Sequence, residues 1–315
     1  DHDNEGRRID NFLFSNFKYI PKSKIYKVIR KGEVRVNSKR VKPDTKLSKN
    51  DLIRIPPNLI NQEKTLDINI SKYVFLKDKV IYDDEDFLIF NKPSNYAVHS
   101  GTKNDHGLID ILRAVLKDNS LNLCHRLDKG TSGCLVIAKN QKFLGFFNNQ
   151  LKKRKVKKIY HAIVKDFIYE EMVIEDSIDT NTKGSFNKVS INKNGKEAKS
   201  IFKPLKKLDC SSLIEIEIFT GRTHQIRVHM KYIGHPLFND FEYGGDKILR
   251  GTTFSKYKQF VFNCFKALPR QALHATSLRF IHPVSNKLVS FDAGLPHDMN
   301  SVIMRWRNYV EYQLD

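Results

Sequence analysis

The chain has 315 residues, 40% of them hydrophobic, which is enough to bury a substantial core and a smaller second domain. Lys and Arg number 55 against 35 Asp and Glu, and the net charge of +20 favours polyanionic partners, most commonly nucleic acid. No apolar run approaches the roughly 18 residues of a membrane span, and the acidic N-terminus lacks the apolar segment of a secretory signal. Because the chain begins at Asp1 rather than Met, we expect a few residues to precede it.

The cysteines indicate a reducing compartment rather than a disulfide or metal scaffold. They show no CxxC spacing and no histidine at zinc-finger distance. We therefore predict a cytoplasmic protein with reduced thiols that acts as a monomer. The four cysteines are Cys124, Cys134, Cys210 and Cys264.

Residues 1–57 are predicted to form a small domain that begins with two helices. Apolar residues recur at helical spacing from Ile9 to Leu13, and Pro21 interrupts this pattern. A second helix is expected from Ser23 to Lys31, with Gly32 as its C-terminal stop. Short strands then follow at residues 34–36, near Val41 and at residues 52–55, with a turn near Asn37 between the first two.

The small domain carries a concentrated positive charge. Between Lys18 and Lys42 the sequence has ten basic residues and one acid, Glu33. Such a surface is suited to phosphate contacts, and a solvated face without a ligand is the alternative. The candidate RNA contacts in this region are Lys22, Lys24, Arg30, Lys31, Arg35, Lys39 and Arg40.

A linker and a larger domain follow. Residues 58–75 are polar and aperiodic and are predicted to be a linker, whereas residues 76–315 show mixed strands and helices. Residues 247–269 are polar and aromatic and are predicted to form a loop. Apolar runs predict strands at residues 80–82, 87–90, 135–138, 160–164 and 213–219, of which the last alternates and should be half-buried.

The segment from His125 to Gly133, HRLDKGTSG, is the most informative of the chain. It places one carboxylate, Asp128, in a turn directly before an apolar strand. Gly130 and Gly133 permit a tight backbone path, so such a turn can hold the carboxylate rigidly at the mouth of a pocket. An ordinary surface loop is the alternative from this segment alone.

Two other segments bear on chemistry. In residues 220–230, TGRTHQIRVHM, we expect Thr223 to cap a helix that Gly234 ends, with Ile226, Met230 and Ile233 facing inward. His224, Arg227 and Lys231 would share another face, and an arginine so placed can pair with a buried carboxylate. Tyr160 directly follows a run in which six of the seven residues from Lys152 to Lys158 are basic, a combination that suits a splayed-out RNA base.

Several motifs in fixed order resemble the RluA family of pseudouridine synthases. They are KPxxxxVHxG, HRLDxxTSG, KxYxA, GRTHQIRVH followed by GHPLFND, and Leu273-His274-Ala275 to His282-Pro283. The first 57 residues are similar to an S4 RNA-binding domain. The pair Lys129-Gly130 departs from the residues common in the family after the motif aspartate.

The resemblance implies a fold, a reaction and roles for particular residues. The implied fold class is α+β, a mixed and mainly antiparallel sheet with flanking helices, plus the small α/β S4 domain. The implied reaction converts uridine to pseudouridine in large-subunit (23S) ribosomal RNA, without metal or cofactor. Asp128 would be the catalytic aspartate, Arg227 its ion-pair partner and Tyr160 the aromatic residue at the target base. Further RNA contacts would be Arg126, Lys153, Arg154, Arg222 and His224.

Three alternatives remain at this stage. The first is an idle RNA-binding ribosome assembly factor, which should have lost one of the three catalytic residues. The second is the same chemistry on another structured RNA. The third is a metal-dependent phosphoesterase, which the histidines disfavour because they lack an HxH or HExxH arrangement with neighbouring acids. The sequence also leaves open whether Asp128 acts as a nucleophile or takes a proton from the sugar.

Overall fold

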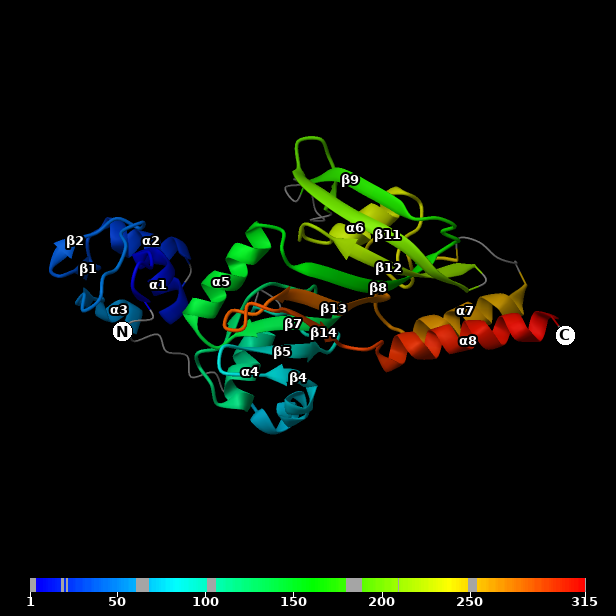
Figure 1. The fold of residues 1–315 in the computed structure, drawn as a ribbon, viewed down its shortest axis with the longest axis horizontal. Helices are drawn as coiled ribbons and strands as arrows, with labels where there is room; N and C mark the ends of the chain where they lie inside the picture. The colour runs from blue at the N-terminus through cyan, green and yellow to red at the C-terminus, as the bar shows by residue number, and fades with distance from the viewer. Residues whose placement is uncertain are drawn as a thin grey trace. The chain divides into compact units, whose positions relative to one another are not determined.

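A computed structural model describes residues 4–17, 20, 22–60, 68–100, 106–179, 189–208, 210–248 and 254–314. Within them the chain forms two compact units, an N-terminal one that ends at Asn69 and a C-terminal one that begins at Ile70 (Figure 1). No helix in these ranges is long and apolar enough to cross a bilayer.

The N-terminal unit contains the predicted helices and strands. Helices α1 (Ile9–Asn16) and α2 (Lys22–Arg30) pack with an antiparallel sheet in the order β2 (Lys39–Arg40), β1 (Arg35–Val36) and β3 (Ile53–Arg54). Gly32 adopts φ of +72° after α2, as expected of a helix stop. Asn37 and Ser38 both have positive φ, which is the conformation of a tight hairpin turn between β1 and β2. The predicted break at Pro21 lies outside the described residues.

The apolar positions of this unit form its core and leave the charges outside. Ile9, Leu13, Ile25 and Val34 are completely buried, because they repeat at helical spacing or point from the sheet toward the helices. Among the candidate RNA contacts, Lys24 and Arg35 are half-buried and the others are exposed. The exposed ones are Lys22, Arg30, Lys31, Lys39 and Arg40.

The stretch predicted to be a linker has helical turns at both ends. Helix α3 (Pro57–Ile60) follows the N-terminal sheet, and the 3₁₀ helix η2 (Ile70–Lys79) leads into the C-terminal unit. Leu76 of η2 is completely buried and belongs to the core of the C-terminal unit, so η2 packs as part of that unit. Residues 61–67 lie outside the described part of the chain.

The C-terminal unit is built on one eleven-stranded sheet, and the predicted mixed, mainly antiparallel fold class is confirmed. All pairings are antiparallel except that of β7 with β13, which run in parallel. The main path is β10 (Ser190–Ile191), β9 (Met172–Asp179), β11 (Lys196–Leu208), β12 (Ser211–Ile218), β8 (Lys157–Lys165), β13 (Leu273–Ile281), β7 (Ser132–Ala138), β5 (Phe87–Lys92) and β4 (Val80–Asp83). Strand β14 (Leu288–Asp292) pairs with β13, and β6 (Asn122–Leu123) pairs with β7.

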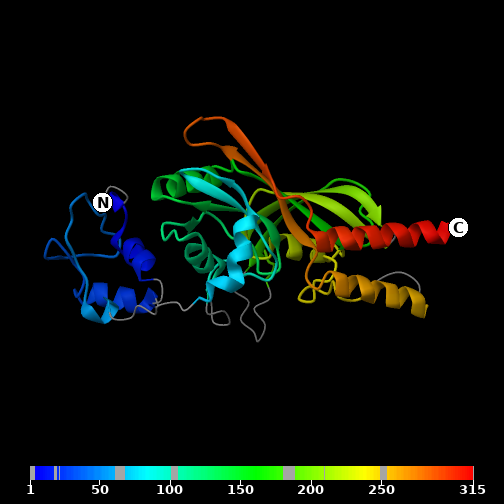
Figure 2. The ribbon, with the colours of Figure 1, turned by 90° about the horizontal axis from the view of Figure 1, so that it is seen from below.

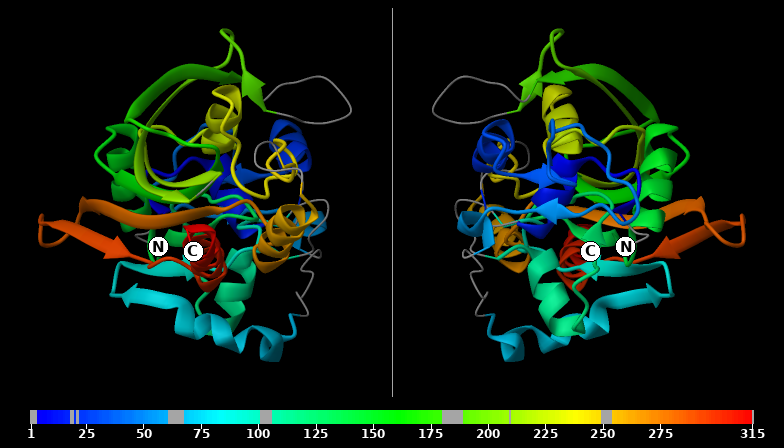
Figure 3. Two further views of the ribbon diagram at one scale, coloured as in Figure 1. Left: turned by 90° about the vertical axis from the view of Figure 1, so that its right-hand side faces the viewer. Right: turned by 90° about the vertical axis from the view of Figure 1, so that its left-hand side faces the viewer.

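Helices bury the apolar faces of this sheet. Residues of α4 (Leu108–Leu116) and α6 (Gln225–Tyr232) belong to the largest core cluster, and those of α5 (Gln141–Lys152) to a second one. Helices α7 (Ser255–Ala267) and α8 (His297–Leu314) pack side by side and form a third (Figures 2 and 3). All five predicted strands of this unit are present.

The predicted loop at residues 247–269 is wrong, because α7 occupies most of it. The buried positions are Tyr257, Val261, Cys264 and Phe265, whose spacing of four, three and one residues is that of a helix face. Lysines and polar residues between them hide this period when the segment is judged by composition. Residues 249–253 lie outside the described part of the chain.

Candidate active site

A small pocket forms where the beginnings of two parallel strands meet the end of a third. Because β7 and β13 are parallel, the loops that precede them lie at the same edge of the sheet, and Ser132 is in register with His274. Ile218, the last residue of β12, and the segment from Gly221 to Arg227 that leads into α6 also line the pocket. The pocket has a volume of about 60 Å³. Its lining includes Arg126, Asp128, Thr131, Tyr160, Arg222, His224, Arg227 and Leu273.

Two buried basic side chains, Lys92 and Arg270, hold the turn around Asp128 through its backbone carbonyl groups. Lys92 is completely buried, and its Nζ donates to the carbonyl oxygens of Tyr96 at 2.9 Å, Pro93 at 3.0 Å and Lys129 at 3.2 Å. Arg270, which is 4% exposed, donates to the carbonyl oxygen of Gly130 at 3.1 Å. The two peptides that follow Asp128 are therefore fixed, while its side chain remains 19% exposed in the pocket.

Burial dominates the electrostatics of Lys92. It lowers the pKa of this lysine to about 7, with a further reduction from the charge of Arg270 and an opposing contribution from Asp128. When Lys92 is protonated, the three carbonyl oxygens match the three N–H groups of its ammonium group. The motif KPxxxxVHxG thus serves architecture in this structure.

Gly133 permits the close approach of β7 to β13. It adopts φ of +109°, and a Cβ atom there would lie 2.2 Å from the carbonyl oxygen of Ala275. Both conditions exclude a side chain. Gly133, the last residue of HRLDKGTSG, therefore allows β7 and β13 to approach each other closely next to the turn of Asp128.

His224 lies between Asp128 and Tyr243. Its Nε2 is 4.0 Å from the Asp128 carboxylate, and its Nδ1 is 2.9 Å from the Tyr243 hydroxyl. Burial lowers the pKa of His224, an effect that Asp128 opposes and Arg227 reinforces, so the ring is neutral at neutral pH. Burial also raises the pKa of Tyr243, which keeps its hydroxyl protonated. When that hydroxyl donates to Nδ1, the proton of the ring resides on Nε2 and faces Asp128.

The predicted ion pair between Arg227 and Asp128 is absent from the described residues. The Arg227 guanidinium instead binds Asp240 in a bidentate pair, with Nε and Nη2 at 2.6 and 2.7 Å from the two carboxylate oxygens, and it also contacts Glu242. The side chains of Arg227 and Asp240 are 4% and 1% exposed. Burial alone would lower the pKa of Arg227, but the hydrogen bonds and charge of Asp240 raise it overall. A carboxylate at fork geometry outcompetes Asp128, which acts on Arg227 only at longer range.

Helix α6 begins differently from the prediction. Thr223 does not cap it, because the N-cap position is His224, in a left-handed conformation with φ of 54°. Gln225 instead binds the preceding turn, accepting from Thr220 Oγ1 at 2.8 Å and from the Arg222 amide at 3.1 Å. This turn aims His224 at the pocket. The C-terminal end near Gly234 and the inward face of Ile226 and Met230 agree with the prediction.

Tyr160 lies in the pocket wall at the site where the sequence places an aromatic ring. It is 7% exposed and lies on β8, directly across from Ile216 of β12. Burial raises the pKa of its hydroxyl, and the negative charge of Asp128 adds to this effect. The basic run before it is partly neutralised, because Lys157 pairs with Glu217 at 2.8 Å and Arg154 with Glu197 at 3.4 Å.

The structure brings together six of the fifteen predicted site residues and leaves the other nine elsewhere. Asp128, Tyr160, Arg126, Arg222, His224 and Arg227 line one pocket. Lys153 and Arg154 follow α5 and do not line it. Lys22, Lys24, Arg30, Lys31, Arg35, Lys39 and Arg40 belong to the N-terminal unit.

Sequence reasoning did not assign four residues that organise the pocket. Asp240 and Tyr243 hold Arg227 and His224, and the Arg227 guanidinium lies 4.8 Å from the centre of the Tyr243 ring. Lys92 and Arg270 hold the turn of Asp128. For two of them the sequence offered an indication, because they belong to family motifs: Asp240 ends GHPLFND and Lys92 begins KPxxxxVHxG.

The chain is similar to known proteins over most of its length. Residues 86–232 match the RNA pseudouridylate synthase family, and residues 7–53 match the S4 domain. The chain is 38% identical to ribosomal large subunit pseudouridine synthase C of Haemophilus influenzae, over 97% of this chain and 93% of that protein. It is 36% identical to the protein of the same name from Escherichia coli K12, over 97% and 95% of the two chains.

Solved structures show the same fold. Human RNA pseudouridylate synthase domain containing 4 superposes with a TM-score of 0.60 at 23% identity, covering 76% of this chain and 96% of that one. Human RNA pseudouridylate synthase domain containing 1 gives a TM-score of 0.53 at 25% identity, over 73% and 94% of the two chains.

Proposed function

The chain belongs to the RNA pseudouridylate synthase family, and on this premise we propose that Asp128 drives the isomerisation of a flipped-out uridine in large-subunit ribosomal RNA. The observation that carries this role is the position of Asp128, a carboxylate accessible in a pocket whose loop is clamped by Lys92 and Arg270. The ribosomal substrate is the one stated in the names of relatives that match over nearly the whole chain.

The reaction breaks the bond between uracil N1 and ribose C1′, turns the base and joins C5 to C1′. Asp128 can contribute by attacking C1′ or by taking a proton from the sugar, and both routes need its carboxylate ionised and within reach of the ribose. Three arginines line the pocket with Asp128: Arg126, Arg222 and Arg227.

We assign His224 and Arg227 to positioning and electrostatics rather than to bond making. The neutral His224 ring presents Nε2 to Asp128 and is itself held by Tyr243. Asp240 holds the Arg227 guanidinium in one position, so Arg227 contributes a positive charge at a defined place.

Tyr160 is proposed to stack on the uracil while the base is detached. Tyr160→Phe should keep RNA affinity within about threefold, because base–aromatic stacking survives loss of the hydroxyl. Tyr160→Leu removes the aromatic face and should weaken binding by about 1–3 kcal/mol. Filter binding and single-turnover assays on the two variants separate these roles. Unchanged behaviour of Tyr160→Leu would exclude stacking.

The N-terminal unit is proposed to supply phosphate contacts. We assign residues 1–57 to RNA binding, residues 58–75 to the connection and residues 76–315 to catalysis, in a monomer that works in the cytoplasm. The unit matches an S4 domain, and its exposed cations, such as Arg30, Lys39 and Arg40, lie on a small rigid scaffold.

Charge removal tests this assignment. Replacing Arg30, Lys39 and Arg40 with Gln should flatten the salt dependence of RNA binding by about 0.7–0.9 log units for each phosphate that the variant no longer neutralises. Three exposed lysines of the C-terminal unit, replaced by Gln, serve as the control: Lys203, Lys206 and Lys287. An equal slope in both triple variants would mean that the N-terminal charges are merely solvated.

Mapping pseudouridines in ribosomal RNA tests the whole proposal. Cells that lack this gene should lose pseudouridine at specific large-subunit positions, and the wild-type gene should restore them where Asp128→Asn does not. Restoration of growth or assembly without pseudouridine would favour an RNA-binding assembly factor. If pseudouridine is lost only from another RNA, that RNA is the substrate and not large-subunit ribosomal RNA.

A further inference from the structure

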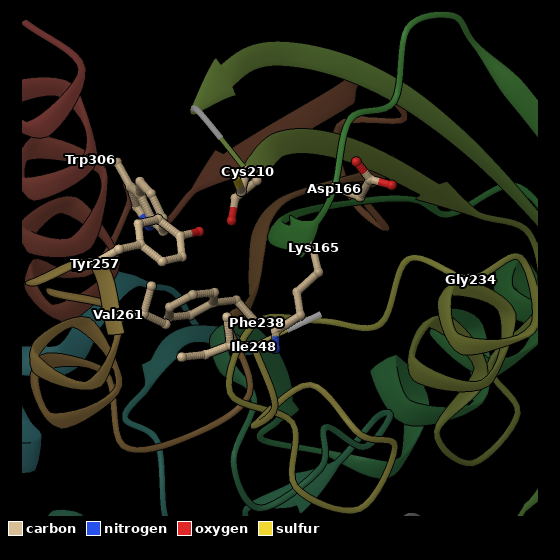
Figure 4. Close-up of a pocket in the computed structure, with 10 residues that line it drawn as sticks. Lys165, Asp166, Cys210, Gly234, Phe238, Ile248, Tyr257, Val261 and Trp306 are labelled. Atoms are coloured by element: carbon tan, nitrogen blue, oxygen red, sulfur yellow. The ribbon is translucent and has the colours of Figure 1, made fainter. Parts of the chain in front are cut away.

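A second pocket in the C-terminal unit has no part in the chemistry above. Its volume is about 110 Å³, and it lies between the end of β8, the beginning of β12 and helices α7 and α8 (Figure 4). None of its lining residues lines the pocket of Asp128. Lys165 is five residues beyond Tyr160 on β8, which corresponds to about 17 Å along an extended strand.

The pocket contains an unpartnered buried lysine. Lys165 is 5% exposed, and its Nζ has no hydrogen-bond partner within the described residues. Its nearest favourable neighbour is the ring of Phe265, whose centre lies 5.3 Å from Nζ. Burial lowers the pKa of Lys165 to about 8, and the charge of Asp246 opposes this effect from longer range. An ammonium group held in an apolar setting without a bound counter-ion costs stability, so a ligand that supplies the charge would be bound with a gain.

A second donor in the same pocket is also unsatisfied. The indole Nε1 of Trp306, a residue that is 1% exposed, has no acceptor among the described residues. Asp166 is the one carboxylate among the described lining residues, and Figure 4 shows its side chain pointing away from the cluster of Lys165, Phe238 and Trp306. Within the described part of the chain, the pocket therefore has two buried donors without an acceptor, Lys165 Nζ and Trp306 Nε1.

The remaining walls are apolar and limit the size of a ligand. Phe238, Ile248, Tyr257 and Val261 lie on the side of Lys165 that faces α7 and α8 (Figure 4). A dry cavity of about 150 Å³ holds one benzene molecule, so this volume suits a body of a few carbon atoms. We propose that this pocket binds a short-chain monocarboxylate, with its carboxylate on Lys165 and its carbon chain against the aromatic walls on the side of Trp306.

The protein provides its own reporter for this binding. Trp306 is the only tryptophan of the chain, so a change in indole fluorescence reports directly on the pocket. Titration of the intact protein with butyrate should give a saturable change with a dissociation constant on the order of millimolar, as expected for so small a ligand. Butyramide, which has nearly the same shape and no charge, should bind at least about tenfold more weakly, a difference of about 1.4 kcal/mol.

Two variants assign the binding to its residues. Lys165→Met keeps the apolar stem and removes the charge, so butyrate affinity should fall at least tenfold while the melting temperature stays equal or rises. Trp306→Phe should weaken binding several-fold, measured by ligand-observed NMR because the fluorophore is gone. Lys206→Met, on the exposed side of β11, is the matched control and should bind butyrate like the wild type.

Three outcomes would overturn the proposal. If butyrate causes no saturable change, the cavity holds water only. If butyrate and butyramide bind equally, the pocket selects size and not charge. If Lys165→Met retains wild-type affinity, the lysine is not the anchor. None of these outcomes affects the role of Asp128, because pseudouridine formation is measured separately.

Discussion

Asp128→Asn is expected to lower the rate of pseudouridine formation by at least about 10³-fold, within the range for removal of an acid–base or nucleophilic group. The substitution keeps the size of the side chain and leaves the clamp by Lys92 and Arg270 intact, because both cations bind backbone carbonyls and not the carboxylate. RNA affinity should therefore stay within several-fold of the wild type. Single-turnover assays on a ribosomal RNA fragment, together with filter binding, measure the two quantities.

The matched control for this experiment is Asp83→Asn. Asp83 is 55% exposed and pairs with Lys139 on the surface, so its charge should matter little. It should retain full turnover. Substantial pseudouridine formation by Asp128→Asn would show that another group starts the reaction, whereas a parallel loss of RNA affinity would indicate that the charge serves binding.

Asp240→Asn should destabilise the C-terminal unit by about 3–5 kcal/mol, the usual cost of leaving a buried charge without its partner. Arg227 would lose the ionised half of its bidentate pair in a site where both side chains are almost inaccessible. Because Trp306 lies in the same unit and is the only tryptophan, its fluorescence in urea follows unfolding of this unit. Activity should fall as well, since Arg227 also lines the pocket.

Glu242→Gln provides a comparison on the same arginine. Glu242 also contacts Arg227 but is 44% exposed, and exposed ion pairs contribute about 0–1 kcal/mol. Glu242→Gln should therefore lower the free energy of unfolding much less than Asp240→Asn does. Equal destabilisation by the two substitutions would mean that burial does not distinguish the partners, and a stable, active Asp240→Asn would remove Asp240 from the architecture of the site.

Local patterns in the sequence predicted many of the elements. The helices near Ile9 and Ser23, the turn at Asn37 and the strands at residues 87–90 and 213–219 follow from apolar periodicity and from residues that tolerate positive φ. Strand β11 escaped prediction because its outward positions carry many lysines and Pro204 falls at a bulge. Helix α7 escaped because polar residues separate its buried positions.

Motif order identified the family, and with it the reaction, since separate ordered motifs leave few other folds available. The candidate residues Asp128, Tyr160 and His224 lie together, as motifs at strand ends can suggest. The sequence could not show which carboxylate Arg227 would take. Asp240 and Asp128 are chemically equal choices along the chain, and only the turn after α6 brings Asp240 to fork geometry.

The sequence by itself therefore determined the family and its reaction, and it singled out Asp128 as the carboxylate that we propose for catalysis, because these inferences depend on residue types in a local order. Only the tertiary structure decided how that carboxylate is held. Lys92 and Arg270 are far apart in the sequence of the C-terminal unit. They bind carbonyl groups of the same turn because β7 and β13 run in parallel. The packing likewise determines that Lys165 is buried without a hydrogen-bond partner among the described residues. The sequence does not show this, because the solvent exposure of a lysine depends on the residues around it in the fold.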